Sequence, residues 1–322
     1  MNARFWPLPD AWLTFAMISA SDPKRAIDLL TKRVMKTSLL FVTSWCVLGL
    51  LSACTADEAD APRDEQLSTV RVLTPEQVNY VPLNPARGDR SPKAGVLWGD
   101  IRSDRSSGVL LQFADGFSSP PHIHNITYRA VVISGELHND DPGAEMFWMG
   151  PGAFWTQPAG ENHITAARPG SGATAFLEIL SGPYLVQPAT EAFDNGERPV
   201  NVASSNLVWM GAEEFSWVAK KSGNTSAEVA LLWGELSGES FNGSFVRMSS
   251  GFSGSVSTIS GLLRSVVVQG ELAHSVSNAT ETTVIGAGGF FESAHGLDHS
   301  VSCQSDSPCV IYLRTRGEFR VQ

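Results

Sequence analysis

An internal repeat constrains the fold of this chain more than any other feature of its sequence. A Leu-Trp-Gly-acid segment, a Gly-Phe-Ser segment and an apolar segment ending in Gly-Glu-Leu each occur twice, and each second copy lies 135 residues after the first. The first copies occupy residues 97–100, 116–118 and 129–137, and the second copies occupy residues 232–235, 251–253 and 264–272. Gly152, Gly160 and His163 recur as Gly288, Gly296 and His299, at an offset of 136. Because the spacing changes by only one residue over such a span, the sequence predicts two copies of one domain.

Each copy has the pattern of short strands joined by turns. In the first copy, residues 108–113 end shortly before a glycine turn, while residues 125–133 and 173–180 are apolar or β-branched and end at Ser-Gly pairs. A helical interpretation fails because too many glycines and β-branched residues would lie inside helices. The 29 glycines and 18 prolines fit frequent turns. The sequence therefore predicts an all-β chain, with an antiparallel sandwich or barrel in each copy.

The N-terminus carries the features of an export signal. Basic residues within 24–36 precede an apolar run over residues 39–51, which is too short to span a bilayer comfortably. The run ends in Leu-Ser-Ala-Cys, and this order of features resembles a bacterial lipobox with its cysteine at Cys54. The resemblance implies that Cys54 is acylated and becomes the mature N-terminus. A short membrane anchor that is never cleaved is the alternative.

The repeat and the export signal together predict four segments. Residues 1–53 are expected to be a signal peptide, and its first 34 or so residues are either an overcalled start or a long leader before Met35. Residues 54–67 are acidic and contain Pro and Ala, which predicts a solvated tether that carries the lipid. Residues 68–195 and 196–322 are expected to be the two domains.

The expected location is the cell envelope, with the membrane contacted through the lipid anchor only. Thr55 stands where an aspartate would retain a lipoprotein in the inner membrane, by resemblance to the sorting rule of enteric bacteria, which favours the periplasmic face of the outer membrane. In this oxidising compartment, Cys303 and Cys309 could close a hairpin as a disulfide between two strand-like segments. Two unpaired thiols are the alternative.

Three histidines of the first copy have the spacing of a metal site. His122 and His124 are separated by one residue, so strand alternation points both side chains to the same face. His163 follows a turn fixed by Pro158 and Gly160, and it begins the returning strand, which can bring a third imidazole opposite the first two. Three histidines on rigid strands with open coordination positions indicate a catalytic-type metal site rather than a closed structural one.

These segments resemble the two sequence motifs of the cupin superfamily. The His122-x-His124 pattern matches the first motif, and residues 152–163 match the second, whose trailing asparagine is Ala167 here. The resemblance extends from about residue 68 to the end of the chain. The repeated Trp-Gly-acid segment points to a DUF4437-like bicupin family of unknown function, related to the cupin domain of ChrR-type zinc-binding anti-sigma factors. The resemblance implies two tandem double-stranded β-helix, or jelly-roll, barrels of the RmlC-like type and one bound divalent metal ion (Fe, Zn or Mn).

The chain departs from the first cupin motif at one position that matters for the metal. The motif places a glutamate three or four residues after its second histidine, where this chain has Tyr128 and Arg129. Three neutral imidazoles leave the charge of a divalent ion uncompensated, which favours an anionic ligand. Three-His iron cupins that cleave carbon–carbon bonds with O2, or oxidise thiols, resemble this arrangement. Tyr128 is the one catalytic candidate; its hydroxyl is a weak ligand, a hydrogen-bond donor to substrate, or part of barrel packing.

Several residues near these motifs have two interpretations each. His138 is expected to be exposed rather than a fourth ligand. Glu178 lies in an apolar strand, where it either faces outward or accepts a hydrogen bond from a metal-ligating histidine. Trp148, Phe154 and Trp155 either pack in the core or form a hydrophobic mouth for a small organic ligand in the first barrel.

The second copy lacks the histidine pair. The counterparts of His122, His124 and Tyr128 are Ser257, Ile259 and Leu263. Only His299, the counterpart of His163, is kept, with an unmatched His295 nearby. Ile259 and Leu263 suit a closed apolar core. The second barrel is therefore expected to be structural and to pack against the first barrel or against a second copy of the chain in a homodimer.

Charge and motifs limit the functions that remain. The formal net charge is −10 and no basic stripe is present, so nucleic acid is not expected as a partner. The sequence contains no nucleophile elbow, phosphate loop, CxxC pair or HExxH motif. A metal-dependent dioxygenase or isomerase that acts on a small anionic molecule is the first hypothesis. A non-catalytic ligand- or metal-binding or sensing module of the cell envelope is the second, and a structural lipoprotein with a vestigial site is the third.

Overall fold

The computed structural model describes residues 70–322, apart from short gaps at 221–222, 224, 236–239, 260, 278–280 and 295–296. The described residues lie within one compact unit of the chain. The predicted signal peptide, the lipidation site Cys54, the tether and His295 lie outside the described residues. The helices in the described part are short 3-10 turns, and none of them combines the length and the apolar character that a membrane span needs.

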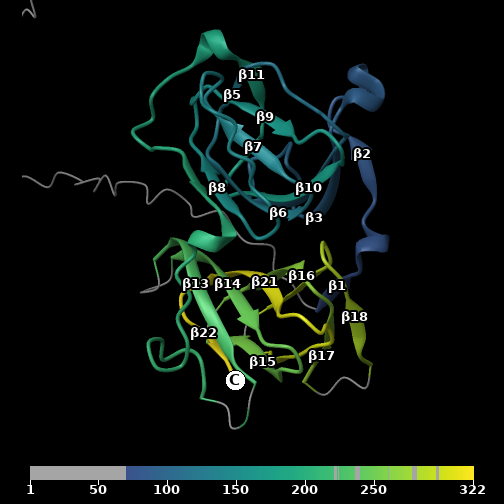
Figure 1. The fold of residues 1–322 in the computed structure, drawn as a ribbon, viewed down its shortest axis with the longest axis vertical. Helices are drawn as coiled ribbons and strands as arrows, with labels where there is room; N and C mark the ends of the chain where they lie inside the picture. Colours follow the sequence, from purple (N-terminus) through teal and green to yellow (C-terminus); the bar gives the residue numbers. More distant parts are fainter. Residues whose placement is uncertain are drawn as a thin grey trace, which may run out of the picture. The chain divides into compact units, whose positions relative to one another are not determined.

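The first barrel is built on a seven-stranded antiparallel sheet (Figure 1). Its strand order is β12 (Val200–Val202), β8 (Phe154–Gln157), β6 (Tyr128–Ser134), β10 (Ala173–Ile179), β4 (Ser107–Phe113), β3 (Lys93–Trp98) and β2 (Tyr80–Pro82). Two smaller pairs complete the barrel: β5 (His122–His124) with β11 (Val186–Pro188), and β7 (Leu137–Asp140) with β9 (Ile164–Ala167). Alternating apolar side chains of both parts form one interior cluster, so each strand has an inner and an outer face.

The second barrel repeats this plan with two antiparallel sheets. The first sheet has the order β1 (Arg71–Leu73), β19 (Phe290–Ser293), β16 (Leu263–Gln269), β21 (Cys309–Arg316), β14 (Phe241–Met248) and β13 (Ala227–Gly234). The second sheet has the order β18 (Thr283–Ile285), β17 (Leu272–Val276), β20 (His299–Cys303), β15 (Ser253–Thr258) and β22 (Phe319–Val321). The helical turns are η2 (Pro75–Gln77), η3 (Pro85–Arg90), η4 (Ala189–Glu191) and η5 (Ser204–Asn206). The predicted all-β class is confirmed.

Each barrel includes one short strand from the segment that was predicted to belong to the other domain. β1 lies within the first predicted domain, yet it pairs with β19 of the second barrel, where Leu73 is opposite Phe290. β12 comes from the start of the second predicted domain, yet it pairs with β8 of the first barrel, where Val202 is opposite Phe154. Backbone hydrogen bonds therefore join the two barrels in both directions.

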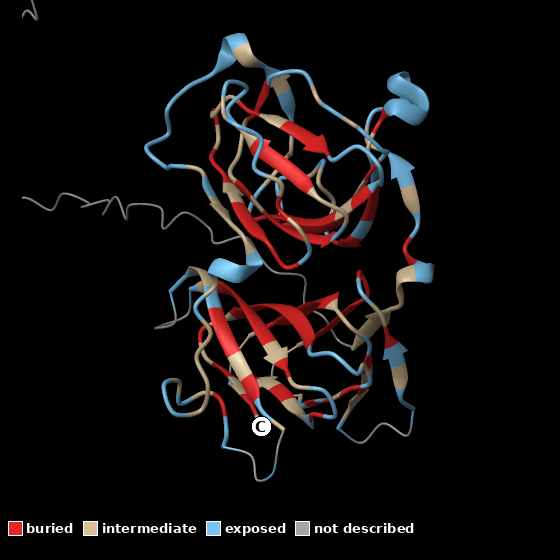
Figure 2. Ribbon diagram, viewed as in Figure 1, coloured by how far each residue is buried: buried red, intermediate tan, exposed pale blue. Residues whose placement is uncertain are grey.

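Burial is concentrated inside the two barrels and in a layer between them (Figure 2). The layer contains apolar side chains of both barrels, including Leu110, Phe154 and Phe176 of the first and Phe245, Phe290 and Tyr312 of the second. Trp98 of the first barrel stacks on Phe290 of the second, with ring centroids 5.3 Å apart. The second barrel thus packs against the first, and Phe154 belongs to this packing rather than to a ligand mouth.

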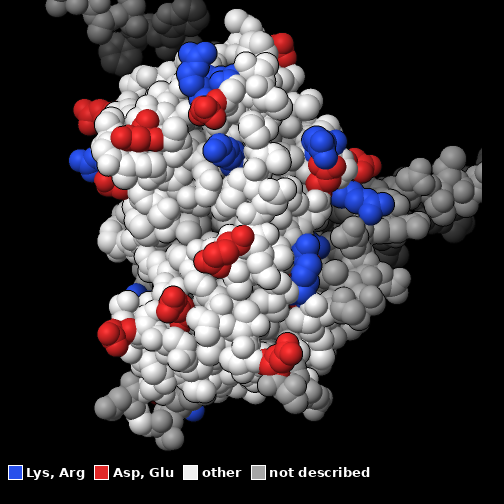
Figure 3. Space-filling view, turned by 90° about the vertical axis from the view of Figure 1, so that its right-hand side faces the viewer, with Lys and Arg blue, Asp and Glu red and all other residues white. Residues whose placement is uncertain are grey.

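Charged side chains are spread over the face shown in Figure 3. Lys and Arg side chains lie between Asp and Glu side chains there, and the described residues of this face form no continuous basic surface.

Cys303 and Cys309 form a disulfide in the structure. Cys303 ends β20 and Cys309 begins β21, and their Cα atoms are 5.7 Å apart in a disulfide. Both residues are buried in the core of the second barrel. The disulfide closes the hairpin between the two strands, so the two cysteines are not unpaired thiols in this structure.

Ile259 and Leu263 of the second barrel were both predicted to lie in its apolar core, and only Leu263 does so. Leu263 is 1% exposed and lies in the core, whereas Ile259 is 59% exposed, so its predicted place in the core is wrong. β15 ends at Thr258, and the chain turns out of the sheet at Ile259. The alternation that places inward side chains therefore no longer applies there.

His299 lies in a buried chain of hydrogen bonds in the second barrel. Its Nδ1 is 2.8 Å from Nε2 of His274, and its Nε2 is 2.7 Å from Oγ of Ser293. Both imidazoles lie against the ring of Phe291. Burial lowers the pKa of His274 to about 4, and burial together with the neighbouring His274 lowers the pKa of His299 to about 3. Both imidazoles are therefore neutral in the folded protein at neutral pH.

Acid is expected to destabilise the second barrel through this histidine pair. The folded-state pKa values lie below the unfolded value of about 6.5, so below this pH the unfolded chain binds protons that the folded chain does not. The contribution to stability is complete above about pH 6.5 and is lost as the pH falls towards 4, at up to about 1.4 kcal/mol per pH unit for each histidine. Urea unfolding measured at pH 7 and pH 5 gives the difference.

The variant His274→Asn provides a control for this prediction, because asparagine is the residue at the corresponding position of the first barrel, Asn139. It removes one of the two titrating groups, so its stability should change less between pH 7 and pH 5. An unchanged pH dependence in this variant would assign the acid sensitivity to other groups.

Candidate metal site

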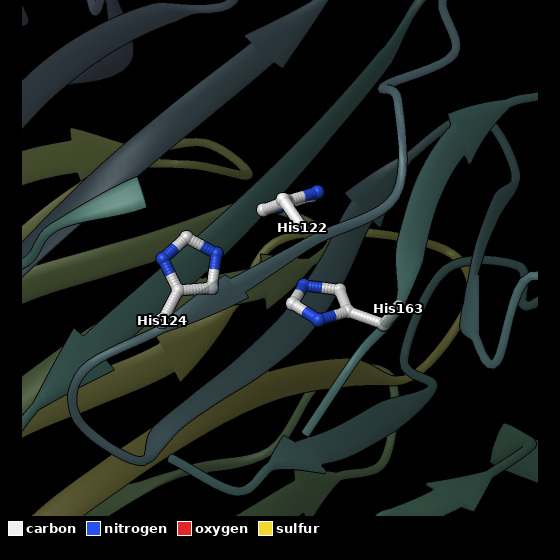
Figure 4. Close-up of side chains that lie close together, drawn as sticks. All are labelled: His122, His124 and His163. Carbon is white, nitrogen blue, oxygen red and sulfur yellow. The ribbon is translucent and has the colours of Figure 1, made fainter. Parts of the chain in front are cut away.

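The three predicted histidines meet inside the first barrel. His122 and His124 lie on β5, and His163 lies directly before β9. His122 and His163 are directly opposite each other and exchange two backbone hydrogen bonds, both 3.0 Å long. This pairing turns their side chains to the same side, and strand alternation adds His124. The candidate ligand atoms all lie within 4.8 Å of one another, and Figure 4 shows the three rings turned towards a common space.

Backbone carbonyl groups fix the orientation of each ring. Nδ1 of His122 is 2.9 Å from the oxygen of Pro120, Nδ1 of His124 is 2.9 Å from that of Leu185, and Nδ1 of His163 is 3.0 Å from that of Glu161. A carbonyl oxygen can only accept, so each Nδ1 carries the hydrogen and donates it. Each Nε2 therefore keeps its lone pair, which at His124 faces the hydroxyl of Tyr184 over 3.1 Å. A donated Nδ1 hydrogen is the arrangement that orients metal-ligating histidines in proteins.

Burial keeps the three imidazoles neutral. It lowers the pKa of His163 to about 3, with a further contribution from His122. It also lowers the pKa of His124 well below the ordinary value, with contributions from His163 and His122. The pKa of His122 is lowered by burial and, to a smaller extent, by the charge of Arg87. Metal ions bind the neutral imidazole, so no proton has to leave before binding at neutral pH.

A cavity of about 160 Å³ opens beside the histidines. His122, His124, Tyr128 and Trp155 contribute to its wall. Much of the remaining wall is apolar and comes from inward-facing strand residues and one loop: Leu111, Phe113, Phe117, Ala130, Ala175 and Leu177. Trp155 belongs to the buried apolar cluster of the first barrel and also lines this cavity, so it combines features of both of its interpretations. An apolar cavity with a few convergent polar groups is the usual form of a small-molecule site.

Tyr128 occupies the side of the site where the cupin motif has its carboxylate. Its hydroxyl donates to Oδ1 of Asn139 over 2.9 Å and lies 3.5 Å from Nε2 of His163. Asn139 also accepts from Thr165 and donates to Gln157, so the phenol is held by a buried polar network. Burial raises the pKa of Tyr128 far above its ordinary value, which keeps the phenol neutral. Tyr128 can thus donate a proton in a hydrogen bond but does not supply a negative charge.

Arg129, the second residue at the missing carboxylate position, lies outside the site. Its guanidinium packs over the ring of Trp233 in the second barrel, 4.2 Å from the ring centroid. Strand alternation explains the difference, because Tyr128 and Arg129 are neighbours on β6 and point to opposite faces.

Tyr184 is a site residue that the sequence did not reveal. Its hydroxyl is 3.1 Å from Nε2 of His124, and the two rings stack with centroids 4.2 Å apart. Burial raises the pKa of Tyr184 well above its ordinary value, so the hydroxyl is protonated and can donate to the imidazole. Tyr184 lies in the segment before β11, and the pairing of β11 with β5 brings it to the histidines. No motif marks this segment, so only the strand pairing could have revealed it.

Two other residues lie elsewhere than predicted. His138 is fully buried rather than exposed, and its Nδ1 accepts a hydrogen bond from the backbone N–H of Phe147 over 3.1 Å. It does not belong to the histidine cluster, and the half-buried Trp148 lies beside it. Glu178 faces neither solvent nor a histidine, because it is buried in the layer between the barrels and accepts a 2.6 Å hydrogen bond from Tyr312.

Comparisons with known proteins agree with this architecture. The model of a family described as "Domain of unknown function (DUF4437)" matches residues 71–322. No curated protein sequence matches the chain. Among solved structures, a candidate dioxygenase from Nostoc punctiforme is similar with a TM-score of 0.54 and 13% identity, over 78% of this chain and 80% of that chain. The oxalate decarboxylase of Lactobacillus farciminis is similar with a TM-score of 0.51 and 12% identity, over 81% of this chain and 90% of that chain.

At these identities the likeness concerns the fold alone. It establishes that the two barrels are jelly-roll barrels arranged as in double-barrel cupins, which confirms the predicted fold. What the first barrel does has to be argued from its own residues.

Proposed function

The chain belongs to the DUF4437 family of the cupin superfamily, and on this premise we propose that its first barrel binds one divalent metal ion and uses it on a small organic anion. The observation that carries the proposal is the convergence of three Nε2 lone pairs from His122, His124 and His163 beside an apolar cavity. Each ring is held by its own backbone carbonyl, so the donor set is preorganised.

The residues present fit a catalytic-type metal. Neutral imidazoles suit Zn, Fe, Mn, Cu or Ni, and three protein ligands leave coordination positions open for a substrate. A metal bound there would supply Lewis-acid or O2-activating chemistry. No carboxylate lines the cavity among the described residues, so the charge of a divalent ion would be balanced by an anionic ligand. This charge balance favours a substrate that chelates through an enolate, carboxylate or thiolate.

The largely apolar side chains around the proposed metal site favour chemistry that requires a cavity with little water. The apolar wall excludes water from the ligand, which strengthens electrostatic interactions inside the cavity. Tyr184 presents a protonated hydroxyl group next to His124, where it can donate to an oxygen of the bound ligand once a metal takes the lone pair of His124. Tyr128, next to His163, already donates its one hydrogen to Asn139 and helps to shape the site. We therefore propose a metal-dependent dioxygenase or isomerase as the reaction class.

Oxygen consumption tests this proposal. Protein loaded with Fe(II) is expected to consume O2 with at least one member of a panel of β-diketones and small thiols, and a His124→Ala variant is expected to show none above the rate of free iron. An isomerase would instead convert a substrate without O2 uptake, which NMR of the same mixtures detects. Neither uptake nor conversion across the panel would count against an enzyme.

A second candidate function is non-catalytic binding or sensing of a small ligand. The observation that favours it is the absence of a carboxylate base among the described residues of the cavity wall. Ligand affinity that depends on the metal, with no product formed, would support this candidate over the enzyme.

We propose in addition that the protein acts in the cell envelope, tethered through Cys54. The disulfide between Cys303 and Cys309 supports an oxidising compartment, because such bonds persist outside the cytosol. Substrates would then be small molecules that reach the periplasm.

A further inference from the structure

A short strap closes one side of the cavity mouth. It runs from Leu83 to Pro92 and contains the helical turn η3. Its two ends are tied together, because the backbone N–H of Leu83 donates to the oxygen of Pro92 over 2.8 Å and that of Asn84 donates to Oγ of Ser91 over 2.8 Å. The strap is therefore a closed loop with a defined position at the mouth rather than a free connection.

The strap places one arginine at the cavity. Arg87 lies on η3 and contributes to the cavity wall, and it is the only residue among the described lining residues with a formal charge at neutral pH. Its side chain is exposed at the mouth, and its guanidinium makes no ion pair with a described residue. Arg90 lies on the same turn but does not line the cavity. Arg87 is thus a cation without an ion-pair partner among the described residues, and it lines a largely apolar space.

The volume of the cavity limits the size of its occupant. An engineered apolar cavity of about 150 Å³ in another protein binds benzene, so a cavity of about 160 Å³ suits a ligand with a body of about one six-membered ring. Nucleotides and oligosaccharides are too large for it. Most of the lining residues are apolar, so the body of the ligand is expected to be apolar too.

We propose that the cavity selects a small aromatic or branched organic acid, whose carboxylate pairs with Arg87 while a second oxygen donor faces the three histidines. This assignment rests on the proposed metal site and adds its substrate class. A guanidinium binds a carboxylate with two parallel hydrogen bonds, and the apolar surroundings strengthen the pair relative to bulk water. Arg87 is a specificity-determining residue in this arrangement.

A matched pair of probe ligands tests the assignment on the full chain loaded with Co(II). Catechols chelate metals through two oxygens, and 3,4-dihydroxybenzoate carries a carboxylate where 4-methylcatechol carries a methyl group. Calorimetry measures the two dissociation constants, and the visible spectrum of Co(II) reports whether each ligand reaches the metal. The unmodified protein is expected to bind 3,4-dihydroxybenzoate about tenfold more tightly than 4-methylcatechol, corresponding to one charge-assisted pair.

Two variants separate the role of Arg87 from general surface charge. Arg87→Gln is expected to bring the ratio of the two dissociation constants close to one by weakening the binding of 3,4-dihydroxybenzoate. Arg90→Gln removes the same charge from the same turn and is expected to keep the tenfold ratio. Equal affinities in the unmodified protein, or equal effects of both variants, would overturn the assignment to Arg87. A Co(II) spectrum that neither ligand changes would instead contradict the proposed function itself.

Discussion

Replacing His163 with alanine is expected to lower the metal content of the purified chain from about one ion to less than about a tenth of an ion. The variant loses one of the three Nε2 ligand atoms. The ring centroid of His163 lies 4.3 Å from that of His122 and 5.2 Å from that of His124, so this ring is an integral part of the cluster. Two imidazoles without a carboxylate do not make a stable site. Elemental analysis after equilibration with Zn(II) or Fe(II) at neutral pH measures the effect.

The second repeat provides the matched control for this experiment. His299 is the counterpart of His163 and is also buried. It is hydrogen-bonded to His274 and Ser293 and does not belong to a cluster of three histidines. His299→Ala is therefore expected to lower the stability of the chain while its metal content stays that of the unmodified protein. A folded His163→Ala variant that still holds a full equivalent of metal would show that the ion binds elsewhere.

Removing the carboxylate of Glu178 is expected to lower the free energy of unfolding by about 3–5 kcal/mol, because it leaves buried arginine charge without its partner. Glu178 lies on β10 of the first barrel, and both of its partners lie on β21 of the second: it accepts from the hydroxyl of Tyr312 over 2.6 Å and lies 3.5 Å from Nε of Arg314. Arg314 is 2% exposed, so water cannot take the place of the carboxylate. Urea unfolding of Glu178→Ala measures the loss.

Two comparisons identify the cause of this loss. Glu136→Ala removes the carboxylate of an exposed pair with Arg168, and it is expected to cost less than about 1 kcal/mol. The double variant Glu178→Met with Arg314→Met removes both charges at once, and it is expected to be more stable than Glu178→Ala. If the double variant were the less stable of the two, packing rather than the uncompensated charge would explain the effect.

The sequence was sufficient to predict the features that depend on local periodicity. The nearly constant offset between the two copies, 135 or 136 residues, predicts two similar barrels, and the single residue between His122 and His124 predicts that their side chains share a face. The Tyr128 and Arg129 pair follows the same rule, since one faces the site and the other packs on Trp233. Alternation along a strand is a property of neighbouring residues, so no knowledge of tertiary structure is needed.

The features that depend on distant strand pairing could not be predicted in this way. Tyr184 reaches His124 because β11 pairs with β5, about sixty residues earlier in the chain. Glu178 lies opposite Tyr312 because the outer face of one barrel packs on the other, so an outward side chain is still buried. His138 is buried by the chain that follows it, where Phe147 donates to its ring. In each case the partner comes from a segment without a motif.

The strands that cross between the barrels make the duplicated halves interdependent. A cut near residue 195 would remove β12 from the edge of β8, and it would separate β1 from β19. Either fragment alone would carry an unpaired sheet edge and an uncovered apolar layer, which is the usual template for aggregation. The barrel without the histidine pair thus covers the apolar outer face of the barrel that has it, so the two are expected to fold and unfold together.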